Sequence, residues 1–178
     1  MNAIFVPSNS IKMIKVGLLS DTHGYWDDKY VEYLDGCDEI WHAGDIGSPE
    51  LAARLAAWKP LRAVVGNADG GTLRMDYPKV AHFTVEGVRV LMTHIGGYPG
   101  RYNPAIRKEL YETRPDLFIA GHSHILKVVY DPSLNCLHIN PGAAGISGFH
   151  VVRTLVRFAL QAGKVIDLEV IELGKRGG

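Results

Sequence analysis

The stretch MIKVGLLSDTHG, residues 13–24, establishes how the chain begins to fold. Its first seven residues are rich in Ile, Val and Leu, which predicts a short β-strand, and this strand stops at a polar segment that carries Asp21 and His23. Residues 27–34 then predict a helix, because the segment begins with acidic residues and repeats its apolar residues on one face. We therefore expect a strand, a polar turn and a helix, in that order.

The same order recurs in the next forty or so residues. A strand at residues 39–43 (EIWHA) ends at Gly44-Asp45 and precedes a helix at 50–58, and a strand at 61–65 (LRAVV) ends at Gly66-Asn67. This alternation predicts a βαβ architecture with largely parallel strands. Because such strands have their carboxyl ends at one edge of the sheet, the polar residues that follow them should lie together. They are Asp21, His23, Asp45 and Asn67.

The second half of the chain adds further strands and two more polar strand ends. Residues 83–86 and 88–93 predict a hairpin that runs into His94, residues 96–104 predict a loop, and residues 105–111 predict a helix. An apolar run at 117–120 then leads into Gly121-His122-Ser123-His124. Four more strands are expected, the last two as an antiparallel hairpin: 127–130, 137–140, 154–160 and 165–173.

The size and charge of the chain limit its class. Its 178 residues predict one domain at 13–174, with an extension at 1–12, in which Met13 is an alternative start, and a tail at 175–178. The 19 basic and 19 acidic residues cancel, so a small or locally presented substrate is expected rather than nucleic acid or a membrane. The two cysteines are too few for a disulfide framework, and no signal sequence is evident, which predicts a cytoplasmic protein. The oligomeric state stays open, with a homo-oligomer as one option.

Seven polar residues at strand ends are of the types that bind metals: Asp21, His23, Asp45, Asn67, His94, His122 and His124. Each alone has a structural explanation, since strand-end Asp and Asn residues stabilise turns and a lone His is often a core residue. Together they are too many for coincidence and too many for one metal, but they suit two metals that share one carboxylate. Carboxylate, amide and imidazole ligands without a thiolate favour manganese, iron, zinc or nickel.

The order of these motifs resembles that of the calcineurin-like metallophosphoesterases. The family pattern D-x-H, G-D, G-N-H-[DE], strand-terminal H and G-H-x-H corresponds here to segments that begin at Asp21, Gly44, Gly66, Thr93 and Gly121. The length and the G-N-x-D variant are most similar to the small bacterial and archaeal phosphodiesterases, which resemble the retromer subunit of eukaryotes. The resemblance covers about residues 14–173 and implies an α/β fold, a four-layer αββα sandwich of two mixed sheets flanked by helices.

The resemblance also implies roles for the seven residues. It places Asp21, His23 and His124 on one metal and Asn67, His94 and His122 on the other, with Asp45 bridging them. Two divalent ions, manganese first and iron, nickel or zinc as alternatives, would then activate a bridging hydroxide for in-line attack on a phosphodiester. In this interpretation Asp45, Asn67 and His94 are the catalytic residues. The alternatives are a phosphomonoesterase or nucleotide pyrophosphatase with the same site, and a non-catalytic scaffold of the retromer-subunit type.

Two departures from the family pattern affect the chemistry. The family's proton-donating His after the Asn ligand is replaced by Ala68, for which His42 and His150 are conceivable substitutes. A second family His after His94 is absent, which changes the loop that follows.

Three further residues near these positions have candidate roles. In the loop after His94, Tyr98 and Arg101 are candidate substrate-binding residues, with a solvated loop as the alternative. Asp69 is a candidate to orient a ligand imidazole, with a turn-stabilising role as its alternative.

Overall fold

A computed structural model describes residues 12–177, so the expected extension, apart from Lys12, lies outside the described residues. Ten of the strands form two five-stranded sheets. The first has the order β12-β11-β1-β2-β3, with β1 (Ile14–Leu19), β2 (Glu39–His42), β3 (Leu61–Ala63), β11 (Val152–Gln161) and β12 (Lys164–Lys175). The second has the order β4-β5-β8-β10-β9, with β4 (Val80–Val85), β5 (Val88–Thr93), β8 (Leu117–Ile119), β9 (Lys127–Asp131) and β10 (Cys136–Asn140).

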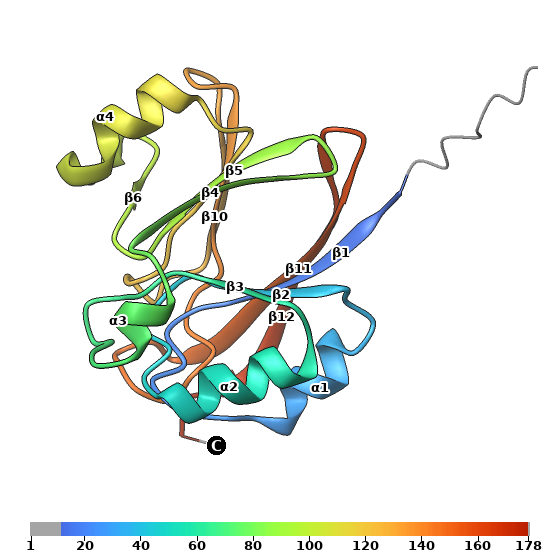
Figure 1. Cartoon of the computed structure of the whole chain (residues 1–178), viewed down its shortest axis with the longest axis vertical. Coiled ribbons are helices and arrows are strands. Elements are labelled where there is room, and N and C mark those ends of the chain that lie inside the picture. Colours follow the sequence, from blue (N-terminus) through green and yellow to red (C-terminus); the bar gives the residue numbers. More distant parts are fainter. Residues whose placement is uncertain (1–11, 178) are drawn as a thin grey trace, which may run out of the picture.

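Both sheets are mixed. In the first sheet β1, β2 and β3 are parallel, whereas the pairs β1–β11 and β11–β12 are antiparallel. In the second sheet β5, β8 and β10 are parallel, whereas the pairs β4–β5 and β9–β10 are antiparallel. The helices are α1 (Asp28–Leu34), α2 (Pro49–Trp58), the short α3 (Leu73–Asp76) and α4 (Pro104–Thr113). In Figure 1, α1 and α2 lie on one outer side of the sheets and α4 lies on the other.

Three hydrophobic clusters show why these layers form. The central cluster joins the facing sides of the two sheets through side chains such as Val16, Trp41, Met92 and Phe158. A second cluster packs α1 and α2 on the first sheet, and a third packs α4 on the second sheet. At Gly17 of β1, an added Cβ would lie 2.8 Å from a Leu34 methyl of α1, so this glycine permits close packing of that helix. The predicted four-layer αββα sandwich is confirmed.

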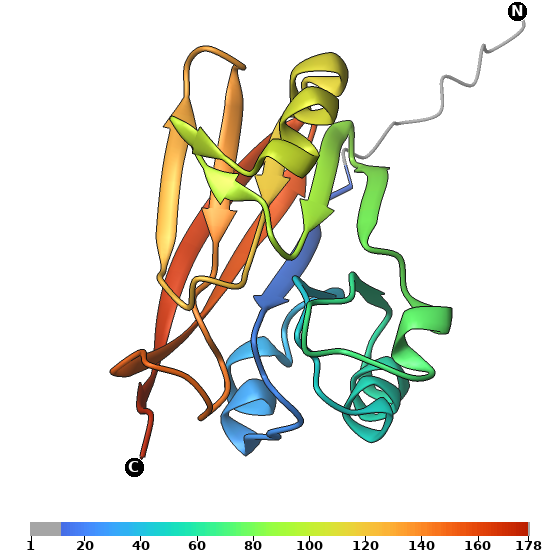
Figure 2. The ribbon, with the colours of Figure 1, turned by 90° about the vertical axis from the view of Figure 1, so that its left-hand side faces the viewer.

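The strands present the predicted ligands at one edge. The arrowheads of β1, β5 and β8 point toward the same end of the molecule (Figure 2). The segments that follow β1, β2, β3, β5 and β8 are joined there by backbone hydrogen bonds, among them Asp21 N–H to the Gly44 carbonyl and Gly121 N–H to the His94 carbonyl, both 3.0 Å. Five strand ends therefore meet at one site.

Apart from element ends that shift by up to three residues, such as the start of β4 at Val80 instead of residue 83, three details differ from the sequence prediction. The loop expected at 96–104 contains a two-stranded hairpin, β6 (Gly97–Tyr98) and β7 (Arg101–Tyr102), and α3 lies in a segment for which no helix was predicted. β12 continues to Lys175, which pairs with Val152, so regular structure extends one residue into the expected tail. β6, β7 and α3 are too short to produce a periodic sequence signal. No helix in residues 12–177 is long and apolar enough to cross a membrane.

Candidate metal centre

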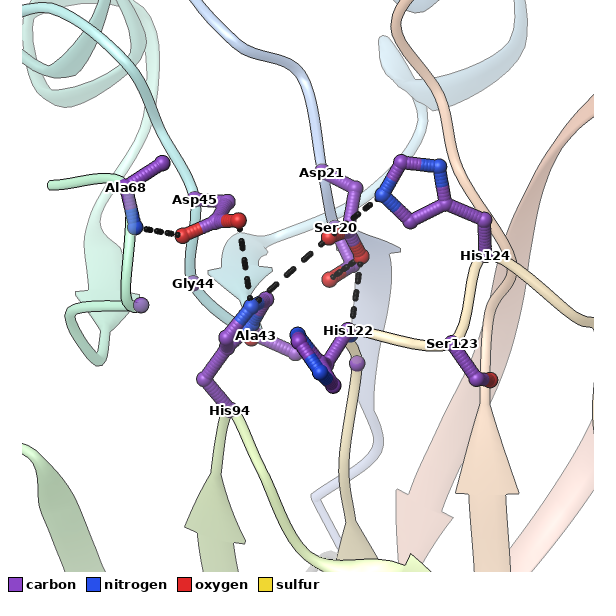
Figure 3. A network of polar contacts seen from close by, with 12 residues as sticks. Ser20, Asp21, Ala43, Gly44, Asp45, Ala68, His94, His122, Ser123 and His124 are labelled. Atoms are coloured by element: carbon purple, nitrogen blue, oxygen red, sulfur yellow. Dashed lines mark hydrogen bonds and ion pairs between the residues drawn. The ribbon is translucent and has the colours of Figure 1, made fainter. Parts of the chain in front are cut away.

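Five of the seven predicted ligands form two overlapping groups. Within each group, one ligand atom per residue lies within 4.8 Å of the others. The first group contains Asp21, His23 and His124, and the second contains Asp21, Asp45 and His94. Figure 3 shows the Asp21 and Asp45 carboxylates and the His94 and His124 imidazoles pointing toward one another from loops that follow different strands. The remaining two, Asn67 and His122, line a cavity that is also lined by three of these five ligands.

The backbone at this site is unusual. Asp21, His23, Asp45, His122 and His124 all have φ between 48° and 68°, in the left-handed region. This conformation is uncommon for residues other than glycine, and it is tolerated where the surrounding structure imposes it. Here it turns the chain sharply just after each strand, so that the side chain points across the sheet edge.

The Asp21 carboxylate is buried and only half satisfied. Its Oδ2 accepts hydrogen bonds from Ser20 Oγ at 2.5 Å and from the His122 N–H at 3.1 Å. Its Oδ1 has no hydrogen-bond partner in the described part of the chain, although His124 Nε2 lies 3.1 Å away. Burial alone would raise the pKa of Asp21, but His124, His94 and Ser20 hold it below its ordinary value. The carboxylate is therefore ionised, with one oxygen free to bind a cation.

His94 is held so that one ring nitrogen faces the carboxylates. Its Nδ1 lies 2.8 Å from the Ala43 carbonyl, which only accepts, so Nδ1 donates. In the neutral ring Nε2 then carries a lone pair, and it lies 3.2 Å from Asp45 Oδ2 and 3.8 Å from Asp21 Oδ1. This buried nitrogen has no hydrogen-bond partner among residues 12–177. Burial alone would lower the pKa of His94, but Asp45 and Asp21 raise it.

His124 is oriented in a similar way by another histidine. His150 Nε2 lies 3.0 Å from the Gly145 carbonyl and must donate to it, so His150 Nδ1 accepts from His124 Nδ1 at 3.1 Å. The remaining His124 Nε2 then faces Asp21 Oδ1 with its lone pair. Gly148 lets this loop approach, because an added Cβ would lie 2.2 Å from His124 Nδ1. Sequence reasoning considered His150 only as a proton donor, since 26 residues separate it from His124 and no motif links them.

Asp45 belongs to the second group and also approaches His23 of the first. Its Oδ1 accepts from the Ala68 N–H at 2.8 Å, and its Oδ2 lies 3.2 Å from His94 Nε2 and 3.9 Å from His23 Nε2. Burial alone would raise the pKa of Asp45, but His94 and the Ala68 N–H lower it. At Gly66, an added Cβ would lie 2.0 Å from Asp45 Oδ1, so the glycine before Asn67 makes room for this carboxylate.

Asn67 and His122 form the exposed side of the centre. Both side chains are exposed, and both line a cavity of about 520 Å³ together with His23, Asp45, His124 and Phe149. The His122 ring lies edge-on to His94, with 5.2 Å between the ring centroids. They are thus placed beside the buried groups, where a substrate entering the cavity would meet them.

Asp69 stabilises the loops that carry the ligands. Its carboxylate accepts from the backbone N–H groups of Gly66 at 2.8 Å, Gly47 at 2.8 Å and Ile46 at 3.2 Å. It thereby ties the loop of Asp45 to the loop of Asn67. The turn-stabilising alternative describes these contacts, because the hydrogen-bond partners of the Asp69 carboxylate among the described residues are backbone N–H groups.

The two predicted substrate-binding residues lie beside the centre. Tyr98 and Arg101 line a separate cavity of about 260 Å³ that shares His122 and Ser123 with the centre. The Lys127 ammonium lies 3.7 Å from the centroid of the Tyr98 ring. One face of this ring is therefore covered by a cation, and a stacked base would have to use the other face.

Neither conceivable proton donor is free at the centre. His42 is fully buried, its Nε2 lies 2.9 Å from Thr22 Oγ1 and its Nδ1 accepts from the Gly44 N–H. Burial lowers the pKa of His42 to about 4, so it is neutral near pH 7. Both ring nitrogens of His150 are also engaged, and burial lowers its pKa. His42 is thus a packed core residue, as the sequence favoured.

The donor set fits a divalent cation. When the His94 and His124 rings are neutral, their Nε2 lone pairs face carboxylate oxygens that have no proton to share with them. Such an arrangement of buried acceptors is unfavourable unless a cation or a bound proton lies among them. Neutral imidazoles and carboxylates are ligands that manganese, iron, nickel and zinc accept.

The comparison with protein families agrees with this geometry. Residues 14–163 match the model of the calcineurin-like phosphoesterase superfamily domain, so the chain belongs to this superfamily. A probable metallophosphoesterase from Methanothermobacter thermautotrophicus is 26% identical over 166 residues, which cover 89% of this chain and 92% of that protein.

Solved structures share the fold. An archaeal phosphodiesterase superposes with a TM-score of 0.73 at 19% identity, covering 90% of this chain and 100% of that chain. Vacuolar protein sorting 29 from Cryptosporidium parvum gives 0.70 at 18% identity, covering 92% and 99%. The same protein from Entamoeba histolytica, in complex with zinc, gives 0.64 at 16% identity, covering 89% and 99%. At these identities the structural similarity establishes the fold alone, and an inference about activity has to come from the site residues.

Proposed function

We propose that this protein is a dinuclear metal-dependent phosphodiesterase that hydrolyses small or locally presented phosphodiesters in the cytoplasm. The observation that carries the proposal is a pair of buried atoms, Asp21 Oδ1 and His94 Nε2, that have no hydrogen-bond partner among residues 12–177 and lie where five strand ends meet. Two divalent cations, manganese by preference and iron, nickel or zinc as alternatives, would supply Lewis acidity and a water of lowered pKa at this point.

In this proposal the chain holds the cations in two adjacent places. Asp21, His23 and His124 would hold one of them. Asn67, His94 and His122 would hold the other, and Asp45 would contact both.

The residues around the substrate have separate tasks. The exposed Asn67 amide and the His94–Asp45 pair lie where the reacting phosphate would enter, which makes them the catalytic candidates. Ser20, Ala43 and His150 fix the ligand atoms through hydrogen bonds. Because these contacts already exist in the folded chain, little reorganisation would accompany the reaction.

Ala68 favours diesters with good leaving groups. Its side chain carries no proton, and its N–H is bound to Asp45. A positioned acid accelerates departure of a poor leaving group by about 10²–10⁴-fold. A site without one is therefore best suited to esters whose leaving group is an acidic alcohol. Monoesterase or pyrophosphatase activity with the same metals is the related alternative.

The test is hydrolysis of bis-p-nitrophenyl phosphate beside p-nitrophenyl phosphate after loading with manganese, nickel, zinc or iron. We expect the diester to be hydrolysed faster, and chelation to abolish the activity. A faster monoester would favour the monoesterase alternative. Failure on both substrates with all four metals would favour the scaffold alternative. Metal content alone does not distinguish an enzyme from a scaffold, because a vacuolar protein sorting 29 also binds zinc.

A further inference from the structure

A third cavity adjoins the metal centre on the side of Asn67 and His94. It has a volume of about 390 Å³, within the range of small-molecule sites, and both of these residues line it. The other walls come from the segment around α3, from the end of β5 and from the start of α4. A group esterified to a phosphate at the centre could therefore extend directly into this cavity.

The permanently charged side chains that line this cavity are all positive. Arg74 and Lys79 line it, and no carboxylate does, whereas the cavity of the metal centre is lined by Asp45. The Lys79 side chain is exposed and makes no ion pair within the described residues. A cation without a partner next to a cavity is available to a ligand anion.

Arg74 is positioned by the loop that carries Asn67. Its Nε donates to the Asp69 carbonyl at 2.5 Å, and its Nη2 lies 3.3 Å from the Asn67 carbonyl. These contacts use carbonyl oxygens and leave the positive charge of the guanidinium uncompensated. The cation is thus fixed beside the metal centre before any ligand arrives.

The remaining walls are mainly apolar. They are formed by Val65, Val80, Ile95, Ala105 and Ile106. An apolar cavity with two cations suits a ligand that has an apolar body and a negatively charged end. A simple dialkyl phosphate would contact the apolar walls and leave Lys79 and Arg74 without an anionic partner.

We propose that this cavity, with Lys79 and Arg74, binds a second phosphate carried by the organic group of the substrate, as in a phosphorylated nucleoside ester. The inference rests on the proposed function, because it places the scissile phosphate at the metal centre. The neighbouring cavity lined by Tyr98 and Arg101 is less suited to this group, since it is smaller, at about 260 Å³, and its Lys127 is engaged with the Tyr98 ring.

The kinetic test compares two substrates that differ by one phosphate. Thymidine 5′-(p-nitrophenyl phosphate) and its 3′-phosphorylated derivative are hydrolysed by the metal-loaded protein, and the ratio of their kcat/KM values is measured. We expect the 3′-phosphate to raise kcat/KM about tenfold, which corresponds to one charge-assisted contact. Lys79→Ala should bring the ratio close to 1. Lys164→Ala, which removes the same charge from the exposed start of β12, should leave the ratio at its wild-type value.

A binding measurement separates this inference from the proposed function. Calorimetry compares thymidine 3′,5′-bisphosphate with thymidine 5′-monophosphate on the wild type, Lys79→Ala and Lys164→Ala. Tighter binding of the bisphosphate that is lost only in Lys79→Ala supports the cavity, even if no diester is hydrolysed. Equal binding of the two nucleotides by the wild type, or a preference that survives in Lys79→Ala, would overturn the inference, even if diesters are hydrolysed.

Discussion

His94 and His138 are equally buried, at 2% and 1% exposure, yet they differ in what their rings face. His138 lies in β10 with its ring centroid 5.3 Å from that of Phe118, and burial lowers its pKa to about 4. His94 faces two carboxylates, which raise its pKa despite the burial. Burial alone thus gives a neutral core histidine, whereas burial opposite Asp21 and Asp45 gives a histidine in a group of side chains that could hold a cation.

The largest effect should come from removing the Asp45 carboxylate, which would contact both cations in the proposal. We expect Asp45→Ala to lower diester hydrolysis by about 10⁴-fold, because it removes the ligand that lies near both His23 and His94. Metal content measured by elemental analysis should fall with the activity. Wild-type metal content and rate in this variant would contradict the bridging role of Asp45.

Substituting the two buried histidines tests the comparison itself. His94→Gln should lower the rate by about 10³-fold and release about one metal per chain, because the lost nitrogen faces the carboxylates. His138→Gln is the matched control and should retain both metals. Kinetics and metal analysis of the two variants measure this, and equal losses would mean that burial rather than the carboxylates defines the site.

Supplying the missing proton donor should increase activity. Ala68→His should raise turnover of diesters with poor leaving groups by about 10²-fold, the lower end of the range for a positioned acid. The gain should be small for p-nitrophenyl esters, which need little protonation. An unchanged rate on alkyl esters would indicate that another group already donates the proton.

His150 tests whether the orientation of a ligand imidazole matters. His150→Phe keeps a ring but loses the nitrogen that accepts from His124, so we expect metal affinity to weaken about tenfold in chelator competition. His150→Asn restores an acceptor and should recover part of the affinity. No difference between these variants would show that His124 is held by packing alone.

The pH dependence of stability should have opposite signs at the two buried histidines. His138 has a lowered pKa, so its contribution is lost as the pH falls from about 6.5 toward 4, by at most about 1.4 kcal/mol per pH unit. His94 has a raised pKa, so in the metal-free protein its contribution to the free energy of unfolding is lost as the pH rises through this raised pKa. Urea unfolding with chelator at pH 5 and 7 should show a smaller acid loss in His138→Gln and a larger one in His94→Gln.

Much of the fold and the gathering of the candidate ligands could be predicted from the sequence, because each candidate lies within a few residues of the end of a strand with an apolar pattern. Asp21 and Asp45 meet because β1 and β2 are parallel neighbours, whereas His94 joins them from the second sheet through its contact with the Ala43 carbonyl. The contact of His150 with His124 could not be predicted, since it depends on a loop that Gly148 brings close. The cavity at Lys79 depends on α3 and the start of α4, whose relative positions have no local sequence signal.

The most direct test of the two-metal account is a crystal structure of the manganese-loaded protein with anomalous scattering. We predict two peaks, one contacted by Asp21, His23 and His124 and the other by Asn67, His94 and His122, with Asp45 touching both. Asp21 lies in both groups of potential ligands, so its place is a sensitive indicator. A single peak, or two peaks bridged by Asp21 while Asp45 touches only one, would contradict the account.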